Sequence, residues 1–255
     1  MSDLVRIETR DRVARIELAR PEKKNALTAE MYTQLAAGLA QAGADARVRA
    51  VLLHGTKDCF TAGNDLADFL KRPPSGESSP TWRFFEVLPN LEKPVVAAVN
   101  GPAVGIGTTM LLHCDLVYAA PGARFQLPFV PLGIVPEFGS TFLLPLLAGY
   151  QRAAELLLLG QPFTAEKAKE FGFVTEIYPE DQFLQKAEAA AAALAALPRE
   201  SVRLTKRLMK ARYGKTVQDT IAEEGKLFVE RLGSPEAKEA MSAFLEKRKP
   251  DFSRF

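Results

Sequence analysis

The segment that most constrains this chain runs from residue 95 to residue 137, near the middle of the sequence. It begins with V-V-A-A-V at 95–99, a short valine-rich run with a proline before it and Asn-Gly after it. Runs of this length and composition, bounded by turn residues, are typical of buried strands. We therefore expect a strand in the middle of a sheet, followed by a sharp change of direction.

Three glycines follow this strand and open an apolar stretch, residues 104–112, that predicts a buried helix. They are Gly101, Gly105 and Gly107. Glycine lets the backbone approach a ligand closely, because no Cβ stands in the way. The first amides of a helix have no internal partner and carry partial positive charge. The segment therefore predicts either an anion or oxyanion site, or only a tight turn where a helix packs on a sheet.

Composition excludes several classes of protein. A chain of 255 residues, 47% of them apolar, can bury a full core, and a net charge of +2 predicts no nucleic-acid partner. Cys59 and Cys114 form no CxxC pair, which fits a reducing compartment, and the two histidines argue against a metal site. The chain has no run of eighteen apolar residues and no signal-like start, so we expect no membrane partner and a cytoplasmic location.

Strand patterns alternate with helix patterns as far as residue 177, and from residue 181 onward the pattern is helical. Residues 4–9 and 13–18 predict a hairpin, and Thr28 is the expected cap of a helix. This order predicts an α/β core with a helical appendage. Residues 71–80, rich in proline, serine and glycine, predict a loop in which a lid or a specificity loop could lie.

Five motifs carry a family resemblance, and they occur in family order and at family spacing. They are R-P-E-K-K-N-A-L at 20–27, F-T-A-G-N-D-L at 60–66, V-N-G-P-A-V-G-I-G at 99–107, F-T-A-E-K-A-K-E-F-G-F-V-T-E-I at 163–177 and F-L-E-K-R-K-P-D-F at 244–252. On these motifs the chain resembles the crotonase, or enoyl-CoA hydratase/isomerase, superfamily. The resemblance implies a ClpP/crotonase-like spiral of β-β-α turns over residues 1–195. It also implies a helical region, 196–255, that assembles a homotrimer or a dimer of trimers.

The same resemblance implies an acyl-CoA substrate and no further cofactor, since the coenzyme A belongs to the substrate. The thioester oxygen would lie between the backbone amides of Asn64 and Ile106. Each such donor contributes about 2.7–4 kcal/mol in comparable sites. Substrate-binding positions would be Ala62, Gly63, Asn64, Asp65, Leu66, Lys24, Gly105 and Phe129.

Some of these residues have structural alternatives. Asp65 is more simply explained as a helix-start residue, and the Asn64 side chain is expected to bond locally within its turn. Lys23 and Lys24 would reach the phosphates of coenzyme A or belong to a solvated surface. The aromatic residues of the 80–92 helix would line an acyl tunnel or, as we favour, fill the core; they are Trp82, Phe84 and Phe85.

Two departures from the hydratase pattern define the expected reaction. Hydratases of the family use two glutamates, and the corresponding positions here hold Thr109 and Phe129. Neither side chain exchanges protons as a carboxylate does, so hydration by that route is not expected. Glu137, in V-P-E-F-G, is a carboxylate with apolar sequence neighbours, which raise the pKa of such a group.

The segment around Glu137 resembles the peroxisomal type of 3-enoyl-CoA to 2-enoyl-CoA isomerase, in which this glutamate is the single acid/base. We predict that Glu137 removes a C2 proton and returns it at C4 of a fatty acyl-CoA, as in fatty acid degradation. The alternative role for Glu137 is a helix N-terminal residue stabilised by the dipole. Two other functions remain open: a different crotonase-type enzyme, such as a hydratase or a dienoyl-CoA isomerase, and a non-catalytic acyl-CoA-binding module.

Overall fold

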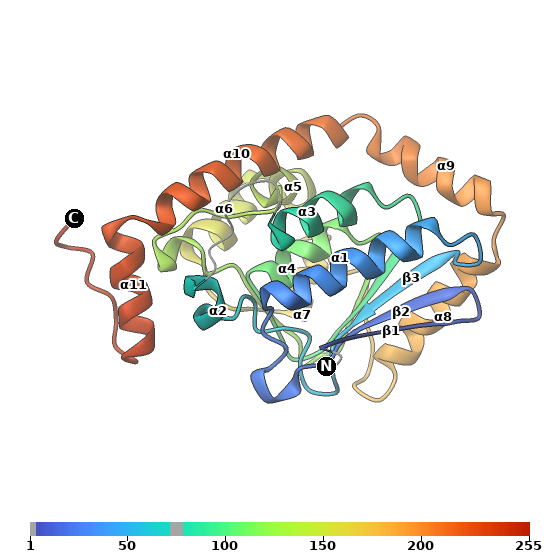
Figure 1. The fold of residues 1–255 in the computed structure, drawn as a ribbon, viewed down its shortest axis with the longest axis horizontal. Helices are drawn as coiled ribbons and strands as arrows, with labels where there is room; N and C mark the ends of the chain where they lie inside the picture. Colours follow the sequence, from blue (N-terminus) through green and yellow to red (C-terminus); the bar gives the residue numbers. More distant parts are fainter. Residues whose placement is uncertain (1–3, 72–78) are drawn as a thin grey trace.

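The computed structural model describes residues 4–71 and 79–255, and its centre is a six-stranded sheet (Figure 1). The strand order is β1-β2-β3-β4-β6-β9. The strands are β1 (Val5–Arg10), β2 (Val13–Leu18), β3 (Ala50–His54), β4 (Val95–Val99), β6 (Leu116–Ala119) and β9 (Glu176–Ile177). β1 and β2 form the expected antiparallel hairpin, and every other pairing in this sheet is parallel. The valine-rich run is thus an inner strand, as predicted.

A second, three-stranded sheet was not predicted. Strand β5 (Pro102–Val104) pairs in parallel with β7 (Arg124–Gln126), which pairs antiparallel with β8 (Phe163–Thr164). The expected helix over 104–112 is accordingly wrong at its start: α4 spans Ile106–Thr109 and continues as the 3-10 helix η2, Met110–His113. Strands of two or three residues are too short to show alternation, so only their partners in space define them.

Helices cover both faces of the large sheet. On one face α1 (Ala29–Ala44), capped by Thr28 as predicted, packs with α3 (Pro80–Asn90). On the other face α8 (Phe183–Ala196) presents alanines one turn apart, among them Ala187 and Ala191. Alanine lets the helix lie close against the strands, because no longer side chain separates the backbones. The inner strands β3 and β4 are therefore buried on both sides, as strands of parallel sheets are, whereas the edge strand β1 is largely exposed.

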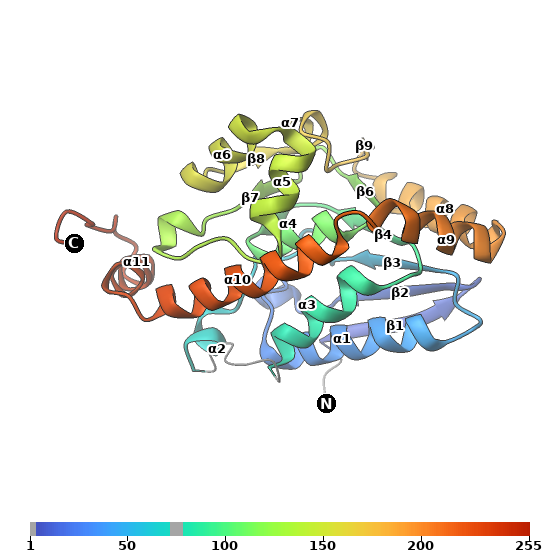
Figure 2. The same cartoon turned by 90° about the horizontal axis from the view of Figure 1, so that it is seen from above.

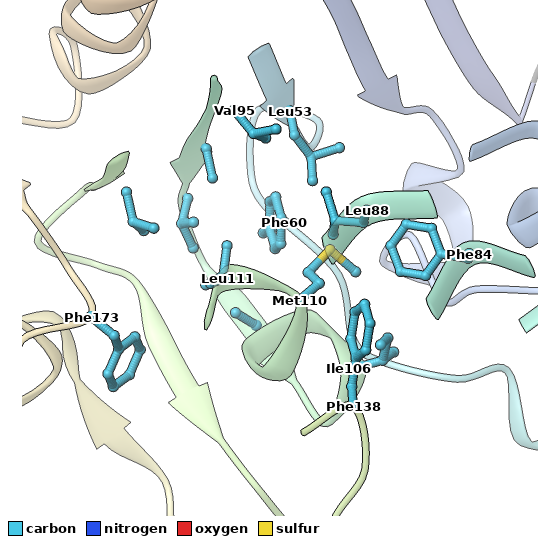
Figure 3. Close-up of a cluster of buried hydrophobic side chains, with 14 of the residues drawn as sticks. Leu53, Phe60, Phe84, Leu88, Val95, Ile106, Met110, Leu111, Phe138 and Phe173 are labelled. Atoms are coloured by element: carbon cyan, nitrogen blue, oxygen red, sulfur yellow. The ribbon is translucent and has the colours of Figure 1, made fainter. Parts of the chain in front are cut away.

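The main core lies between the sheet, α3 and the glycine segment (Figure 3). Phe60, Phe84 and Phe138 are fully buried there, together with Met110 of η2. Phe138 belongs to the V-P-E-F-G segment, so the residue after Glu137 is anchored in the core. The other helices of this part are α2 (Leu66–Lys71), α5 (Ser140–Ala148), α6 (Tyr150–Leu159) and α7 (Ala165–Glu170), with short 3-10 turns η1 (Pro21–Lys23) and η3 (Val130–Leu132).

Three helices form the C-terminal region: α9 (Arg199–Lys210), α10 (Gly214–Leu232) and α11 (Pro235–Leu245). Figure 2 shows α10 crossing in front of α5 and alongside α3, with α11 beyond it at the end of the chain. The ammonium of Lys206 on α9 is buried and lies 2.6 Å from Asp115, which precedes β6. This ion pair joins the helical region to the sheet. The division at residue 195/196 stays a prediction.

Two further predictions concern the 71–80 loop and the absence of a membrane-spanning helix. Most of the predicted 71–80 loop falls outside the described residues. No helix of the described ranges is long and apolar enough to cross a membrane.

Candidate active site

Two loop segments lie side by side at the carboxyl end of the inner strands. Thr61 and strand β5 exchange backbone hydrogen bonds, Thr61 N–H to Pro102 O at 3.0 Å and Val104 N–H to Thr61 O at 3.1 Å. Gly63 has φ of 92°, and a Cβ built on it would lie 2.7 Å from the Val104 carbonyl oxygen. Glycine is therefore required at 63, both by its left-handed backbone and by this close approach.

The amides of Asn64 and Ile106 are the two predicted oxyanion donors. Within the described part of the chain, neither N–H donates a hydrogen bond to another group. Ile106 is the first residue of α4, where an amide has no partner inside the helix, and Gly105 before it has φ of 55°. Both residues line one pocket of about 540 Å³. The geometry thus brings two unpaired donors to a single cavity.

The side chains next to these amides have structural partners. Asn64 Oδ1 accepts a hydrogen bond from the Tyr32 hydroxyl at 2.6 Å, so the expected local turn bond is wrong and the partner is a distant helix. Asp65 accepts from the amides of Ala67 and Asp68 at the start of α2 and pairs with Arg20 at 2.8 Å. Asp65 is thus the helix-start residue expected from the sequence, and its carboxylate is already neutralised.

All but one of the predicted substrate-binding residues line the 540 Å³ pocket; these are Ala62, Gly63, Asn64, Asp65, Leu66, Gly105 and Phe129. Lys24 is the exception, because it lines a separate hollow beside Lys57 and Cys59. Its neighbour Lys23 lies at the pocket instead. Lys24 ends the η1 turn with a left-handed backbone, φ 49°, and the two consecutive lysines line different hollows.

Glu137 lies behind this pocket. Its side chain is buried, 4% exposed, and it borders a small hollow of about 20 Å³ together with Trp82, Phe85 and Phe228. Phe228 also lines the large pocket, so the pocket and the Glu137 hollow adjoin at this residue. The carboxyl group therefore faces the interior of the protein beside the pocket and not the bulk solvent.

The environment of Glu137 favours the protonated acid. Burial first, and then the negative charge of Glu224, raise the pKa of Glu137 from its usual 4.5 to about 8, while the Thr109 hydroxyl opposes the rise. The Thr109 hydroxyl lies near the Glu137 carboxyl, but Glu137 Oε1 and Thr109 Oγ1 form no hydrogen bond of normal length and angle, and Ser140 Oγ is likewise buried without a partner. Unpaired buried polar atoms are rare in proteins, and those found among the described residues belong to this one neighbourhood.

Phe84 and Phe85 belong to the core, as favoured from the sequence, whereas Trp82 is only partly buried, and both Trp82 and Phe85 border the Glu137 hollow. Phe84 and Phe85 are buried, and both rings contact Phe138, with centroid distances of 5.6 and 4.1 Å. Trp82 is partly buried and packs so closely on α10 that a Cβ on Gly225 would lie 2.0 Å from the indole ring. These contacts hold α10 against α3 over the Glu137 hollow.

Sequence reasoning missed the contribution of the C-terminal helices. Phe228 of α10 and the apolar side chains Met241, Phe244 and Leu245 complete the pocket wall. Glu224 of α10 lies next to Glu137 and accepts hydrogen bonds from Gly139 and Thr141. The only sequence signal was the helical periodicity of this region, which places residues on a face without naming what that face contacts.

The amino-acid sequence is similar to those of known proteins along nearly its whole length. The sequence profile of the family described as enoyl-CoA hydratase/isomerase matches residues 8–254. The Escherichia coli (strain K12) 1,2-epoxyphenylacetyl-CoA isomerase is 36% identical over 94% of this chain and 95% of its own length. The human enoyl-CoA delta isomerase 2 is 33% identical over 95% of this chain, which spans 63% of that protein.

Solved structures agree. The structure of Pseudomonas aeruginosa OdaA superposes with a TM-score of 0.93 and 49% identity, covering 96% of this chain and 99% of that one. The chain therefore belongs to the enoyl-CoA hydratase/isomerase family, and its fold is the crotonase fold expected from the motifs. The names of its relatives include more than one reaction, so the family alone does not define the chemistry.

Proposed function

We propose that this protein is an acyl-CoA isomerase that moves a double bond from 3-enoyl-CoA to 2-trans-enoyl-CoA. The observation that carries the proposal is Glu137, a buried carboxyl with an unpaired oxygen and a pKa raised to about 8. Among the described carboxylates around the pocket, Asp65 is paired with Arg20, and Glu224 accepts three hydrogen bonds. Glu137 is the one that is left for chemistry.

The proposed reaction uses one acid/base and two amides. The thioester oxygen accepts hydrogen bonds from the N–H groups of Asn64 and Ile106, which stabilise the negative charge that develops there. The Glu137 carboxylate removes a proton from C2, and the electron pair delocalises into a dienolate that extends to C4. Glu137 then delivers the same proton to C4, and the double bond ends between C2 and C3. A base whose conjugate acid has a pKa near 8 is suited to both transfers.

Hydration is the less favoured reaction because the two family positions for acidic groups hold Thr109 and Phe129. Thr109 lies beside Glu137, the proposed base. Phe129 lines the pocket with an apolar ring. Neither side chain can activate water as a carboxylate does.

The position of Phe228 implies that a side chain moves when the substrate binds. Phe228 lines both the pocket and the Glu137 hollow, and we infer that its ring rotates when the acyl group enters. Phe228 contacts Phe69 edge-on at a centroid distance of 6.0 Å, so the two rings would move together. Closing of the rings over the acyl chain would keep water from the dienolate.

The remaining parts of the proposal concern partners and location. The substrate class is an acyl-CoA thioester of fatty acid degradation, and the proposed steps use no metal or redox cofactor. We further propose assembly as a homotrimer or a dimer of trimers. Exposed apolar side chains on α5 and α6 support it, including Leu146, Tyr150 and Leu158. A cytoplasmic location is proposed from the two unpaired cysteines, Cys59 and Cys114.

The test incubates the protein separately with 3-hexenoyl-CoA and 2-hexenoyl-CoA while absorbance of the conjugated thioester is followed. Absorbance that rises with the first substrate supports the isomerase. Absorbance that falls with the second shows a hydratase instead, and tight binding without change in either shows a binding module. Glu137→Gln should abolish isomerisation and keep acyl-CoA binding; turnover near the wild-type rate in this variant would refute the role of Glu137.

A further inference from the structure

Besides Glu137, the described chain has a second buried glutamate, Glu224 on helix α10, which is 5% exposed. Its Oε2 accepts from the Gly139 N–H at 2.6 Å, and its Oε1 accepts from the N–H and the hydroxyl of Thr141 at 2.8 and 2.6 Å. No lysine or arginine of the described chain pairs with it. A buried carboxylate is costly unless hydrogen bonds satisfy it, so these three bonds require an explanation.

The three donors belong to the first turn of α5. This helix begins at Ser140, and its N-cap residue is Gly139, which has no side chain to accept from the free amides. Glu224 supplies the missing acceptor from a helix more than eighty residues away in sequence. A carboxylate at a helix N-terminus also interacts favourably with the helix dipole. Glu224 is thus a tertiary cap that joins α10 to the start of α5.

The capped turn is the one that carries Glu137. Phe138 has φ of 62° and Gly139 has φ of 74°, so two consecutive residues are left-handed. Such a backbone is unfavourable at phenylalanine and persists only when its surroundings hold it. On one side the His113 Nε2–H donates to the Phe138 carbonyl oxygen at 2.8 Å. On the other side Glu224 holds the Gly139 amide.

We propose that Glu224 is a positioning residue for Glu137: it holds the strained turn against α10 and keeps a negative charge beside the proposed base. This inference rests on the function proposed above. Glu224 touches no substrate atom in this scheme and acts only through the turn and through its charge. Helix α10 thereby belongs to the active site, because it supplies both Phe228 and Glu224.

The charge effect follows from the groups that face Glu137. Glu224 on α10 raises the pKa of Glu137, and Thr109 on α4 opposes that rise. Tyr32 on α1 stays neutral, since burial and then Glu137 raise its pKa. His113 on η2 stays neutral too, because burial lowers its pKa to about 3. Burial, and to a smaller extent the charge of Glu223, raise the pKa of Glu224 as well, but the donors of Thr141 and Gly139 oppose that rise. Glu224 is therefore the member of the pair that ionises more readily, since three donors point at it.

The test compares the full-length wild type with Glu224→Gln, Glu224→Asp and the exposed neighbour control Glu223→Gln. The first readout is the titration of the Glu137 carboxyl by ¹³C NMR with glutamate labelled at the carboxyl carbon, its signal assigned by its loss in Glu137→Gln. In Glu224→Gln the Glu137 signal should titrate at lower pH than in the wild type. In Glu224→Asp and in Glu223→Gln it should titrate near the wild-type pH.

The second readout is steady-state isomerisation of 3-hexenoyl-CoA as a function of pH. Glu224→Gln should lower kcat by on the order of ten- to a hundred-fold with little change in KM, as expected for a misplaced catalytic group. The rise of kcat/KM with pH should move to lower pH together with the NMR titration. Glu224→Asp should recover part of kcat, and Glu223→Gln should match the wild type.

The outcomes separate this inference from the proposed function. An unchanged Glu137 titration in folded Glu224→Gln overturns the charge effect, whether or not the wild type is active. A stability loss without a fall in kcat shows that Glu224 is only a structural cap and overturns the positioning role. A wild type without isomerase activity refutes the proposed function itself, while the NMR titration still decides whether Glu224 acts on Glu137.

Discussion

Replacing Glu137 with glutamine should stabilise the protein, and the gain should grow with pH. A carboxyl whose pKa is 4.5 in the unfolded chain and about 8 in the folded chain binds more protons when folded. Stability therefore falls as pH rises from 4.5 towards 8, because the buried carboxylate must ionise without a partner. Glutamine has the same shape and does not ionise, so it escapes this penalty.

The magnitude follows from the two pKa values. Linkage gives a penalty of about 1 kcal/mol at pH 5, about 3 kcal/mol at pH 7 and about 5 kcal/mol at pH 9. These are upper limits, since water that enters the neighbouring pocket solvates the charge. One kcal/mol shifts the thermal midpoint of a 150–250-residue chain by about 2–4 °C. The advantage of Glu137→Gln should therefore widen by on the order of 10 °C between pH 5 and pH 8.

The assay is thermal unfolding of both proteins across pH 5 to 9 at one protein concentration, since any assembly makes the midpoint depend on concentration. Glu223→Gln, which removes an exposed carboxylate one residue from Glu224, is the control and should show a constant offset from the wild type. A difference between Glu137→Gln and wild type that does not change with pH would refute the reasoning. It would mean that Glu137 ionises as easily in the folded chain as in water.

Three further predictions concern activity and stability. In the wild type, kcat/KM for 3-hexenoyl-CoA should rise with pH and level off above about 8, because Glu137 must be ionised to act as a base; a flat profile from pH 6 to 9 would contradict this. Gly63→Ala should lower kcat ten-fold or more, because its Cβ would lie 2.7 Å from the Val104 carbonyl oxygen and displace the neighbouring Asn64 amide. The loss should be on the order of that caused by removing one oxyanion donor. Unchanged kinetics would exclude this loop from the site. Lys206→Met should lower the free energy of unfolding by about 1.5–3 kcal/mol in urea unfolding, because the half-buried Asp115 loses its ammonium and keeps only the Val95 N–H as a donor. A neutral effect would show that water replaces the ammonium.

Much of the fold was predictable because its signals are local. The hairpin at the start of the chain, the Thr28 cap and the valine-rich inner strand all follow from neighbouring residues. The short strands β5, β7 and β8 were not predictable, since hydrogen bonds from distant segments define them. The Asn64 side chain shows the same limit: its local turn bond was the natural expectation, and the Tyr32 hydroxyl from α1 is its actual partner.

The sequence by itself determined which chemical groups this protein has to work with. Its glycines allow backbone amides to approach a ligand, its motifs belong to one family, and Thr109 and Phe129 leave Glu137 as the available acid. The apolar neighbours of Glu137 in the sequence indicated that its pKa would be raised. Only the tertiary structure decided by how much and by which groups, because a pKa depends on everything that surrounds the group in space. Helix α10 lies about ninety residues after Glu137 in the sequence, and it contributes the charge of Glu224 and the Phe228 side chain beside the acid. The residues next to Glu137 in the sequence could not predict these contacts.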